Sequence, residues 1–164
     1  MKKLLSIIML AFSISVSASD MPLKVVNNTP YKFQYLMTTT YIGAVEPTYA
    51  FPLFRMNDLV TLNPYSTVVY DDPANPGLPF YMLPTTWQYY PTSWSSSTTV
   101  SGNTAYYYSR LSQKWASIKF NVLGTPFSGH IGPFQGSWYS ETDPFSGVTI
   151  TWIPSGSAVT IVLS

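Results

Sequence analysis

Trp115-Ala-Ser-Ile-Lys-Phe-Asn-Val122 is the stretch of sequence that decides the fold. Apolar and polar residues alternate along it. The apolar positions are Ala116, Ile118, Phe120 and Val122, and the polar positions between them are Ser117, Lys119 and Asn121. Successive side chains of a β-strand leave opposite faces of the sheet, whereas a helix would scatter the four apolar residues around its circumference. The stretch therefore predicts a strand with one face on a core and the other toward water.

Other stretches of the same kind lie on both sides of this one. Short runs that alternate or are rich in β-branched residues occupy residues 23–26, 31–37, 59–62, 67–70, 78–83, 105–111, 136–139, 148–152 and 159–163. Clusters of Asn, Pro, Gly and Ser separate them, and such clusters favour turns. The turn Asn27-Asn-Thr-Pro30 predicts a hairpin between the first two runs, and no stretch shows a convincing helical pattern. Together these features predict an all-β, single-domain antiparallel β-sandwich of roughly eight to ten short strands.

The first residues have the pattern of an export signal. Lys2 and Lys3 precede a mostly apolar run, residues 4–16, and Val16-Ser-Ala18 supplies the small residues that a signal peptidase prefers. The run is shorter than the about 20 residues that a membrane-spanning helix needs, and no later stretch approaches that length. We therefore expect residues 1–18 to be a secretory signal peptide of bacterial type. Residues 19–164 are then one β-sandwich domain, secreted or periplasmic, with no transmembrane segment.

The composition excludes several functional classes. Charged residues make up 9% of the 164-residue chain, against about 25% in typical soluble domains. Without Lys2 and Lys3 the basic and acidic residues nearly balance, so the chain lacks the clustered Lys and Arg with which proteins bind nucleic acid. There is no cysteine, which excludes disulfides, thiol catalysis and thiolate metal sites.

The titratable residues give little support for an enzyme. His130 is the only histidine, and the residues around it lack the Gly-x-Ser-x-Gly spacing of a hydrolase nucleophile. We interpret it as a loop histidine packed against a neighbouring proline. Asp71-Asp72 and Glu141-Thr-Asp143 are the only close carboxylates, and both have turn chemistry, although Asp71-Asp72 has oxygens suited to Ca²⁺. We expect a non-enzymatic protein with no cofactor and no bound metal.

Aromatic residues are the more informative excess, at 16% of the chain. Four lie on or beside alternating strands and are expected in the core: Phe33, Trp115, Phe120 and Trp152. Others lie where no core face is evident, and these are the candidate ligand-binding residues: Trp87, Tyr89, Tyr90, Trp94, Tyr106, Tyr107, Tyr108, Trp138 and Tyr139. Exposed Tyr and Trp rings suit a membrane interface, a sugar ring or a choline headgroup. The alternative is that the segment 87–102 folds back as a second small core.

Two short motifs resemble a known group of proteins. Lys24-Val-Val-Asn-Asn-Thr-Pro-Tyr-Lys-Phe33 and Asn63-Pro-Tyr-Ser-Thr-Val-Val-Tyr70, with the aromatic loops, resemble the small single-domain β-sandwich lipid binders, the aegerolysins and actinoporins. In those families the sandwich recognises membrane lipids, and in actinoporins an aromatic cluster holds the headgroup. The resemblance implies that this role falls here to Trp87, Tyr89, Tyr90, Trp94, Tyr106, Tyr107 and Tyr108. The chain shows no amphipathic helix before its first predicted strand, unlike actinoporins, so the resemblance implies lipid binding more than pore formation.

Three functional hypotheses follow. The first is a secreted, non-enzymatic protein that binds a membrane lipid or its headgroup through loop aromatics, with a possible cytolysin-like role. The second is a carbohydrate-binding module that stacks sugar rings on the same Trp and Tyr side chains. The third is a surface-assembly or interaction protein whose aromatic edge pairs with another chain, in which case it forms oligomers.

Overall fold

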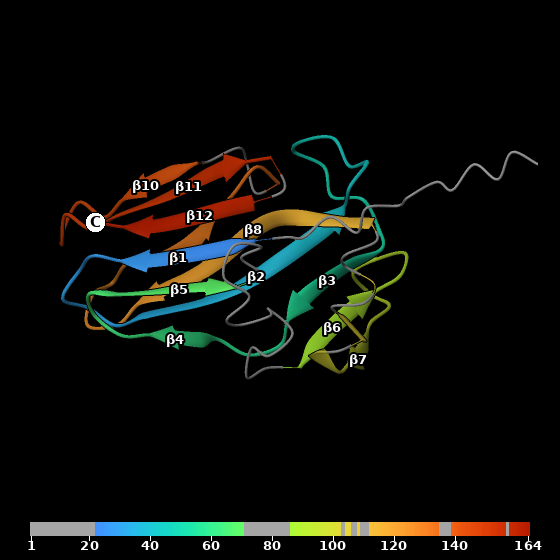
Figure 1. Cartoon of the computed structure of the whole chain (residues 1–164), viewed down its shortest axis with the longest axis horizontal. Coiled ribbons are helices and arrows are strands. Elements are labelled where there is room, and N and C mark those ends of the chain that lie inside the picture. The colour runs from blue at the N-terminus through green and yellow to red at the C-terminus, as the bar shows by residue number, and fades with distance from the viewer. Residues whose placement is uncertain are drawn as a thin grey trace, which may run out of the picture.

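The computed structural model describes residues 22–70, 86–102, 104–105, 108, 112–134, 139–156 and 158–164. These residues form two β-sheets packed face to face (Figure 1). The five-stranded sheet has the order β10 (Ser140–Thr142), β11 (Thr149–Ser155), β12 (Ala158–Leu163), β1 (Leu23–Asn27), β5 (Ser66–Tyr70). The seven-stranded sheet has the order β7 (Thr98–Val100), β6 (Trp87–Tyr90), β3 (Leu53–Met56), β2 (Phe33–Tyr41), β8 (Gln113–Val122), β9 (Ser128–Ile131), and β4 (Val60–Leu62) also pairs with β2.

The predicted all-β sandwich is confirmed. The described residues alone form 12 strands, more than the roughly eight to ten that the sequence pattern indicated. The additional ones are strands of three or four residues in Pro-, Ser- and Thr-rich sequence, such as β3 and β7. The run at 78–83 lies outside the described residues, as does most of 136–139.

The two terminal strands lie side by side at the centre of the five-stranded sheet. β1 and β12 run parallel, with Leu23 opposite Val159 and Asn27 opposite Leu163. All other pairs of strands in the described part of the chain are antiparallel. The predicted hairpin between the first two runs is wrong, because β1 belongs to one sheet and β2 to the other. The turn formers at 28–30 therefore carry the chain between sheets.

The longest ladder joins β2 to β8, from Phe33 opposite Val122 to Tyr41 opposite Gln113. Its register shifts once. Thr38 pairs with Ser117, but the next residue, Thr39, pairs with Trp115. Ala116 is thus the extra residue of a β-bulge, and a bulge changes which side chains face the core on its two sides.

The bulge corrects the predicted faces of two residues. Beyond it, Trp115 is the residue that enters the main core, and Ala116 instead packs with Ala44 and Phe134 in a separate small cluster. Ser117, expected toward water, is also buried. The alternation observed in the sequence therefore holds only from residue 118 onward.

A glycine allows a turn to sit directly on this bulge. Gly132 has a φ of +126°, and a Cβ at this position would lie 2.7 Å from the Ala116 carbonyl oxygen. The backbone N–H of Phe134 donates a hydrogen bond of 3.3 Å to the same oxygen. Because no other residue fits so close to the backbone, the sequence of the turn and the position of the bulge depend on each other.

The main core lies between the two sheets. Phe33, Trp115, Phe120 and Trp152, all expected in the core, are at most 3% exposed. Tyr35 of β2 and Tyr70 of β5 place their hydroxyl oxygens 3.1 Å apart and so link the two sheets. Burial is the main cause that raises the pKa of both hydroxyl groups. Both side chains therefore stay neutral at physiological pH.

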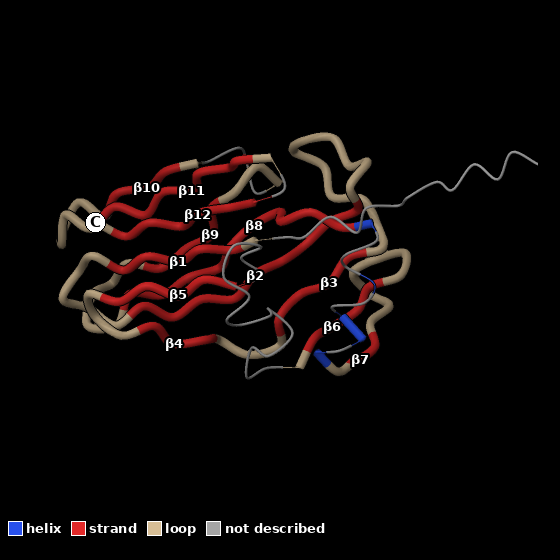
Figure 2. The backbone as a smooth tube through the Cα atoms, viewed as in Figure 1, coloured by secondary structure: helices blue, strands red, loops and turns tan. Residues whose placement is uncertain are grey.

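Ala105 and Tyr108, the described residues of the strand predicted at 105–111, are helical. The helical residues that the structure describes in this part of the chain are Gly102, Thr104, Ala105, Tyr108 and Ser112 (Figure 2). The side chain of Ser101 accepts a hydrogen bond of 3.3 Å from the backbone N–H of Thr104, and its carbonyl accepts one of 3.0 Å from Ala105. This is the geometry of a helix N-cap, so Thr104 and Ala105 begin a helix where the sequence predicted a strand.

The buried side chain of Asn27 joins three segments at the end of the sandwich opposite to the β2–β3 loop. Its amide nitrogen donates to the carbonyl oxygens of Tyr31 (2.7 Å) and Asn63 (2.9 Å). Its amide oxygen accepts from the backbone and the hydroxyl of Thr29. Its amide thus bonds to backbone groups of the crossing from β1 to β2 and of the turn between β4 and β5 that lack ladder partners.

Asn27→Ala is expected to lower the free energy of unfolding by about 3 kcal/mol, because several buried backbone groups lose their partners at about 1–3 kcal/mol each. Urea denaturation measures this loss. Asn28→Ala, at the exposed neighbouring residue, is the control and should change stability by less than about 0.5 kcal/mol. Equal effects of the two substitutions would contradict the role of Asn27.

The stability of the fold is expected to fall as the pH rises above about 10. The tyrosines of the unfolded chain ionise there, whereas the raised pKa values of Tyr35 and Tyr70 keep them neutral when folded. Each such group removes about 1.4 kcal/mol of stability per pH unit. Urea denaturation at pH 8 and pH 11 tests this, and the double variant Tyr35→Phe, Tyr70→Phe should lose less over the same interval than the unchanged protein.

Candidate functional site

The loop of residues 42–52, between β2 and β3, is held by threonine side chains at the end of β2. The hydroxyl of Thr40 donates to the Ala50 carbonyl (3.0 Å) and accepts from the Ala50 N–H (2.9 Å). The hydroxyl of Thr39 accepts from the Phe54 N–H (3.0 Å) and donates to the side chain of Gln113 (2.9 Å). These bonds take the place of a ladder, since β2 and β3 share a single pair, Thr38 opposite Arg55.

The segment 87–102, expected to be irregular, forms a hairpin of β6 and β7. Trp87 and Tyr89 point into the main core, where Trp87 is fully buried and Tyr89 lies 4.9 Å from the Phe54 ring. Both were candidate ligand-binding residues. The prediction for Trp87 assumed an exposed ring, and this assumption is wrong. The alternation of side chains along β6 places the Trp87 ring inside the core.

Tyr90 and Trp94 instead meet the β2–β3 loop and form an aromatic cluster, which we define as Tyr49, Phe51, Tyr90, Trp94 and Phe134. The Trp94 ring packs against three of the others, at centroid distances of 5.4 Å to Tyr49, 5.8 Å to Phe51 and 5.1 Å to Tyr90. Tyr49 also lies 5.6 Å from Phe134. Residues far apart in the sequence thus share one end of the sandwich.

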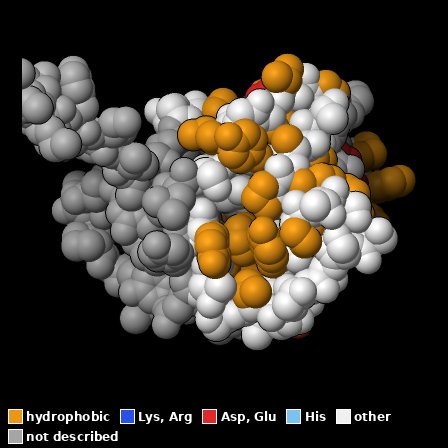
Figure 3. All heavy atoms as spheres, turned by 90° about the vertical axis from the view of Figure 1, so that its right-hand side faces the viewer, with side chains coloured by type: hydrophobic (Ala, Val, Ile, Leu, Met, Phe, Trp, Pro, Cys, Tyr) orange, Lys and Arg blue, Asp and Glu red, His pale blue; other side chains and the backbone are white. Residues whose placement is uncertain are grey.

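Part of this cluster is open to solvent. Trp94 is 48% exposed, and the adjoining β2–β3 loop presents Ile42 (52%) and Val45 (78%). Tyr41, at the end of β2, is also exposed. Figure 3 views this end of the molecule, and hydrophobic side chains with uncharged neighbours dominate the described surface there. Such a gathering of apolar side chains is typical of an interaction site.

Two polar contacts anchor the buried side of the cluster. The hydroxyl groups of Tyr49 and Ser117 are 2.6 Å apart, so the loop is tied to β8 beside the bulge. Burial raises the pKa of the Tyr49 hydroxyl, although Ser117 and Arg55 act in the opposite direction. Lys114 lies 5.0 Å from the centroid of the Phe134 ring, a cation–π contact.

The remaining candidate residues lie apart from the aromatic cluster or cannot be placed. Tyr139 is partly exposed, and its hydroxyl donates a hydrogen bond of 2.9 Å to Glu46 in the β2–β3 loop. Burial and this bond raise its pKa. Tyr108 is helical and exposed, and Tyr106, Tyr107 and Trp138 lie outside the described residues.

Sequence reasoning missed three members of the cluster: Tyr49, Phe51 and Phe134. A signal for two of them was present in Pro47-Thr-Tyr-Ala-Phe-Pro52, where alternate aromatic residues stand between prolines. Both prolines follow cis peptide bonds. Phe134 had no comparable signal, since only the bulge at Ala116 and the close approach of Gly132 bring it to the cluster.

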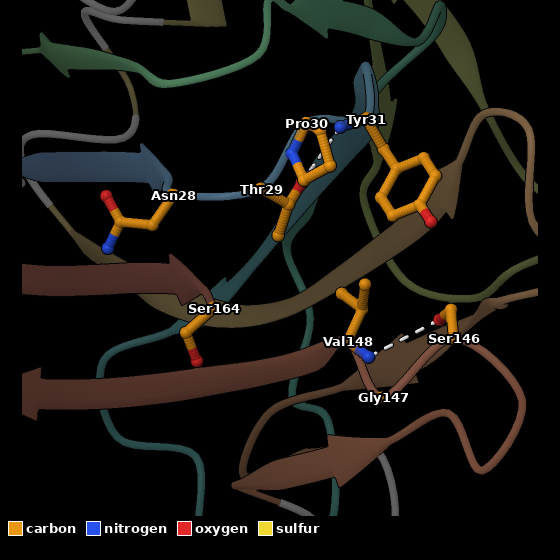
Figure 4. A pocket seen from close by; sticks show the side chains of 8 residues that line it. All are labelled: Asn28, Thr29, Pro30, Tyr31, Ser146, Gly147, Val148 and Ser164. Carbon is orange, nitrogen blue, oxygen red and sulfur yellow. Dashed lines mark hydrogen bonds between the residues drawn. The ribbon is translucent and has the colours of Figure 1, made fainter.

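The opposite end of the sandwich carries an open hollow of about 270 Å³ (Figure 4). It is lined by Asn28, Thr29, Pro30, Tyr31, Ser146, Gly147, Val148 and Ser164. None of these side chains is charged, and the hydroxyl groups of Thr29 and Ser146 accept hydrogen bonds from the backbone nearby. The hollow therefore offers a ligand fewer groups for contact than the aromatic end does.

His130 is a titratable side chain that the structure places differently from the sequence-based expectation. His130 lies in β9 opposite Lys119, not in a loop as expected, and partial burial with the nearby cations Lys119 and Arg55 lowers its pKa. No three His, Asp or Glu side chains gather into a possible metal site among the residues that the structure describes. Within the same residues, no helix has the length and apolar character to cross a membrane. Asp71 and Asp72 lie outside the described residues.

Comparisons with known proteins do not identify the chain. No protein-family model matches it, no curated protein matches its sequence at a significant level, and no solved structure matches its fold at a significant level. The resemblance to aegerolysins and actinoporins therefore remains a prediction.

The two tryptophans of the 87–102 segment should differ in their effect on stability. Trp87→Ala removes a fully buried ring and is expected to cost about 3–5 kcal/mol. Trp94→Ala removes a half-exposed ring with edge contacts and is expected to cost about 1 kcal/mol. Urea denaturation of both variants compares them. A larger loss for Trp94→Ala than for Trp87→Ala would place Trp94 in the core.

Proposed function

We propose that this protein binds a lipid membrane surface through the aromatic end, without catalysing a reaction. The observation that carries the proposal is Trp94, an indole held on three other rings with half of its surface open to solvent. Tryptophan prefers the boundary between water and hydrocarbon, because its ring is apolar and its N–H forms hydrogen bonds. The half-exposed ring therefore has the chemistry of an interfacial anchor.

The neighbouring aliphatic side chains supply the apolar area that an anchor needs. Ile42 and Val45 are more than half exposed on the β2–β3 loop. Removing apolar surface from water contributes about 25 cal/mol per Å². On the free protein these side chains stay in contact with water. When they enter a bilayer interface they leave water, and this transfer contributes to the free energy of binding.

The supporting contacts make the anchor rigid. Trp94 is held by two rings of the β2–β3 loop and by Tyr90 at the end of β6, and the β2–β3 loop is held by the hydroxyl groups of Thr39 and Thr40. A side chain that is already ordered loses little conformational entropy on binding. The arrangement is thus preorganised for a surface and does not need to fold on contact.

The charge of the chain favours binding by apolar contact over electrostatic attraction. Only 9% of its residues are charged, and the net charge is close to zero. Attraction to anionic lipids comes from clustered Lys and Arg and is screened by salt. We therefore expect binding to neutral vesicles and a weak dependence on ionic strength.

A carbohydrate-binding platform built on the same cluster is a less suitable alternative. Several sugar rings in a row require aromatic rings with parallel faces, but Trp94 meets Tyr49 at 82°, Phe51 at 77° and Tyr90 at 62°. The exposed ring of this cluster, Trp94, also lies at an end of the sandwich and not on a sheet face. A surface-assembly role would use the same exposed residues. It differs from the membrane proposal because the protein would then self-associate without lipid, which the experiment below measures.

Vesicle binding tests the proposal. The protein is expected to co-sediment with phosphatidylcholine vesicles and with vesicles that also contain phosphatidylserine, and Trp94→Ala should weaken both interactions about tenfold, equivalent to about 1.4 kcal/mol. The control is Phe145→Ala, because Phe145 is 85% exposed in the turn that follows β10, at the opposite end. Brominated lipid quenches the fluorescence of tryptophan that enters the bilayer. We expect this quenching on binding of the unchanged protein and not on binding of Trp94→Phe.

Three results would contradict the proposal. These are no binding to either vesicle by the folded protein, equal binding by Trp94→Ala, or weaker binding by Phe145→Ala alone. Concentration-dependent self-association without vesicle binding, measured by analytical ultracentrifugation, would favour the assembly hypothesis instead.

A further inference from the structure

A second hollow lies where the two sheets end, beside the aromatic cluster. Its volume is about 190 Å³, which is room for about six waters at about 30 Å³ each. Trp152 and Val159 line it from the five-stranded sheet, and Lys114 and Trp115 line it from the seven-stranded sheet. The hollow is therefore shaped by the ends of both sheets, and its walls do not depend on a single loop.

Polar groups at its rim are positioned by their own contacts. The carboxylate of Glu46 accepts a hydrogen bond of 2.9 Å from the hydroxyl of Tyr139, and both residues line the hollow. Lys114 donates 2.9 Å to the Ala44 carbonyl and lies over the ring of Phe134. In the described part of the chain, Glu46 and Lys114 form no ion pair with each other.

These groups retain capacity for a ligand. A carboxylate offers about four acceptor positions and an ammonium group three donors, and the described contacts use one on each. The two charges have opposite sign, so an ion of either sign is attracted by one and repelled by the other. A neutral molecule with several hydroxyl groups, each both donor and acceptor, can use both.

Four aromatic residues are among those that line the hollow. The ring of Tyr139 is exposed, whereas Trp115, Phe134 and Trp152 are at most 3% exposed and form its floor. Apolar walls with a few placed polar groups are typical of ligand pockets. Trp152 is 2% exposed and its indole N–H has no hydrogen-bond partner among the described residues. The nitrogen has almost no accessible surface, so it lies behind the wall of the hollow, where its signal responds to changes in that wall.

We propose that this hollow binds one pyranose ring of a glycan. The C–H face of the ring packs on the exposed ring of Tyr139, and its hydroxyl groups bond to the carboxylate of Glu46 and the ammonium group of Lys114. The size of the hollow and its mixture of rings with one acid and one base fit a single sugar unit. The site shares Phe134 with the aromatic cluster but does not include Trp94, so different substitutions test the two proposals.

Ligand-observed NMR with the full-length mature protein tests this proposal. The probes are the methyl glycosides of glucose, galactose and mannose, and N-acetylglucosamine; glycine and phosphocholine serve as zwitterionic comparisons. At least one sugar is expected to bind and to shift the indole N–H signal of Trp152, which is identified by its loss in Trp152→Phe. Glu46→Gln should weaken the affinity about tenfold, because the bonds lost are charge-assisted.

Trp94→Ala is the matched control and should leave sugar binding unchanged, so that this proposal and the membrane proposal succeed or fail separately. Vesicles with and without a glycolipid bearing the bound sugar distinguish a lipid-borne glycan from a free one. The proposal is overturned if no sugar binds to the folded protein, if only the zwitterions bind, or if Glu46→Gln binds as the unchanged protein does.

Discussion

The pairing of β2 with β8 is the constraint on which the rest of the structure depends. Its ladder runs through the middle of the seven-stranded sheet, and its single bulge decides which side chains enter the core and which form the outer cluster. On one side of Ala116 the strand contributes Ile118, Phe120 and Val122 to the main core. On the other side it turns Trp115 inward and leaves Ala116 as the base of the outer cluster with Phe134.

The same bulge connects the fold to the candidate site. Gly132 closes on it, Phe134 follows, and the β2–β3 loop covers Ser117 with Tyr49. The exposed ring of Trp94 then rests on a support that reaches back to the central ladder. Both proposed sites use this end of the sandwich, one on its outer surface and one where the sheets part.

The strands that bury one face could be predicted from the sequence, because period-two alternation is a local property. Residues 118–122 and 159–163 show this, and their inward side chains are those that the alternation indicated. The bulge could not be predicted, since it arises from pairing with β2, far away in the chain. The partner of β1 could not either, because a turn signal says that the chain reverses and not which sheet receives it. The sequence after Ser101 favoured a strand by propensity, but the side chain and carbonyl of Ser101 cap a helical turn at Thr104 and Ala105.

The site was predictable in part for the same reason. A surplus of rings in polar sequence pointed to Tyr90 and Trp94, and these two do meet at the surface. It also pointed to Trp87, since composition does not tell an inward ring from an outward one. The residues that complete the cluster come from other loops and become neighbours only through the tertiary fold.

The parallel neighbours β1 and β12 give this chain a particular order of events. The first described strand cannot complete its ladder until the last one has arrived, so the five-stranded sheet closes late. Contacts between the two ends of a chain slow folding, because the long loop must be closed before any pairing is gained. A chain in which β12 has not yet paired thus leaves β1 bonded to β5 on one edge and unpaired on the other.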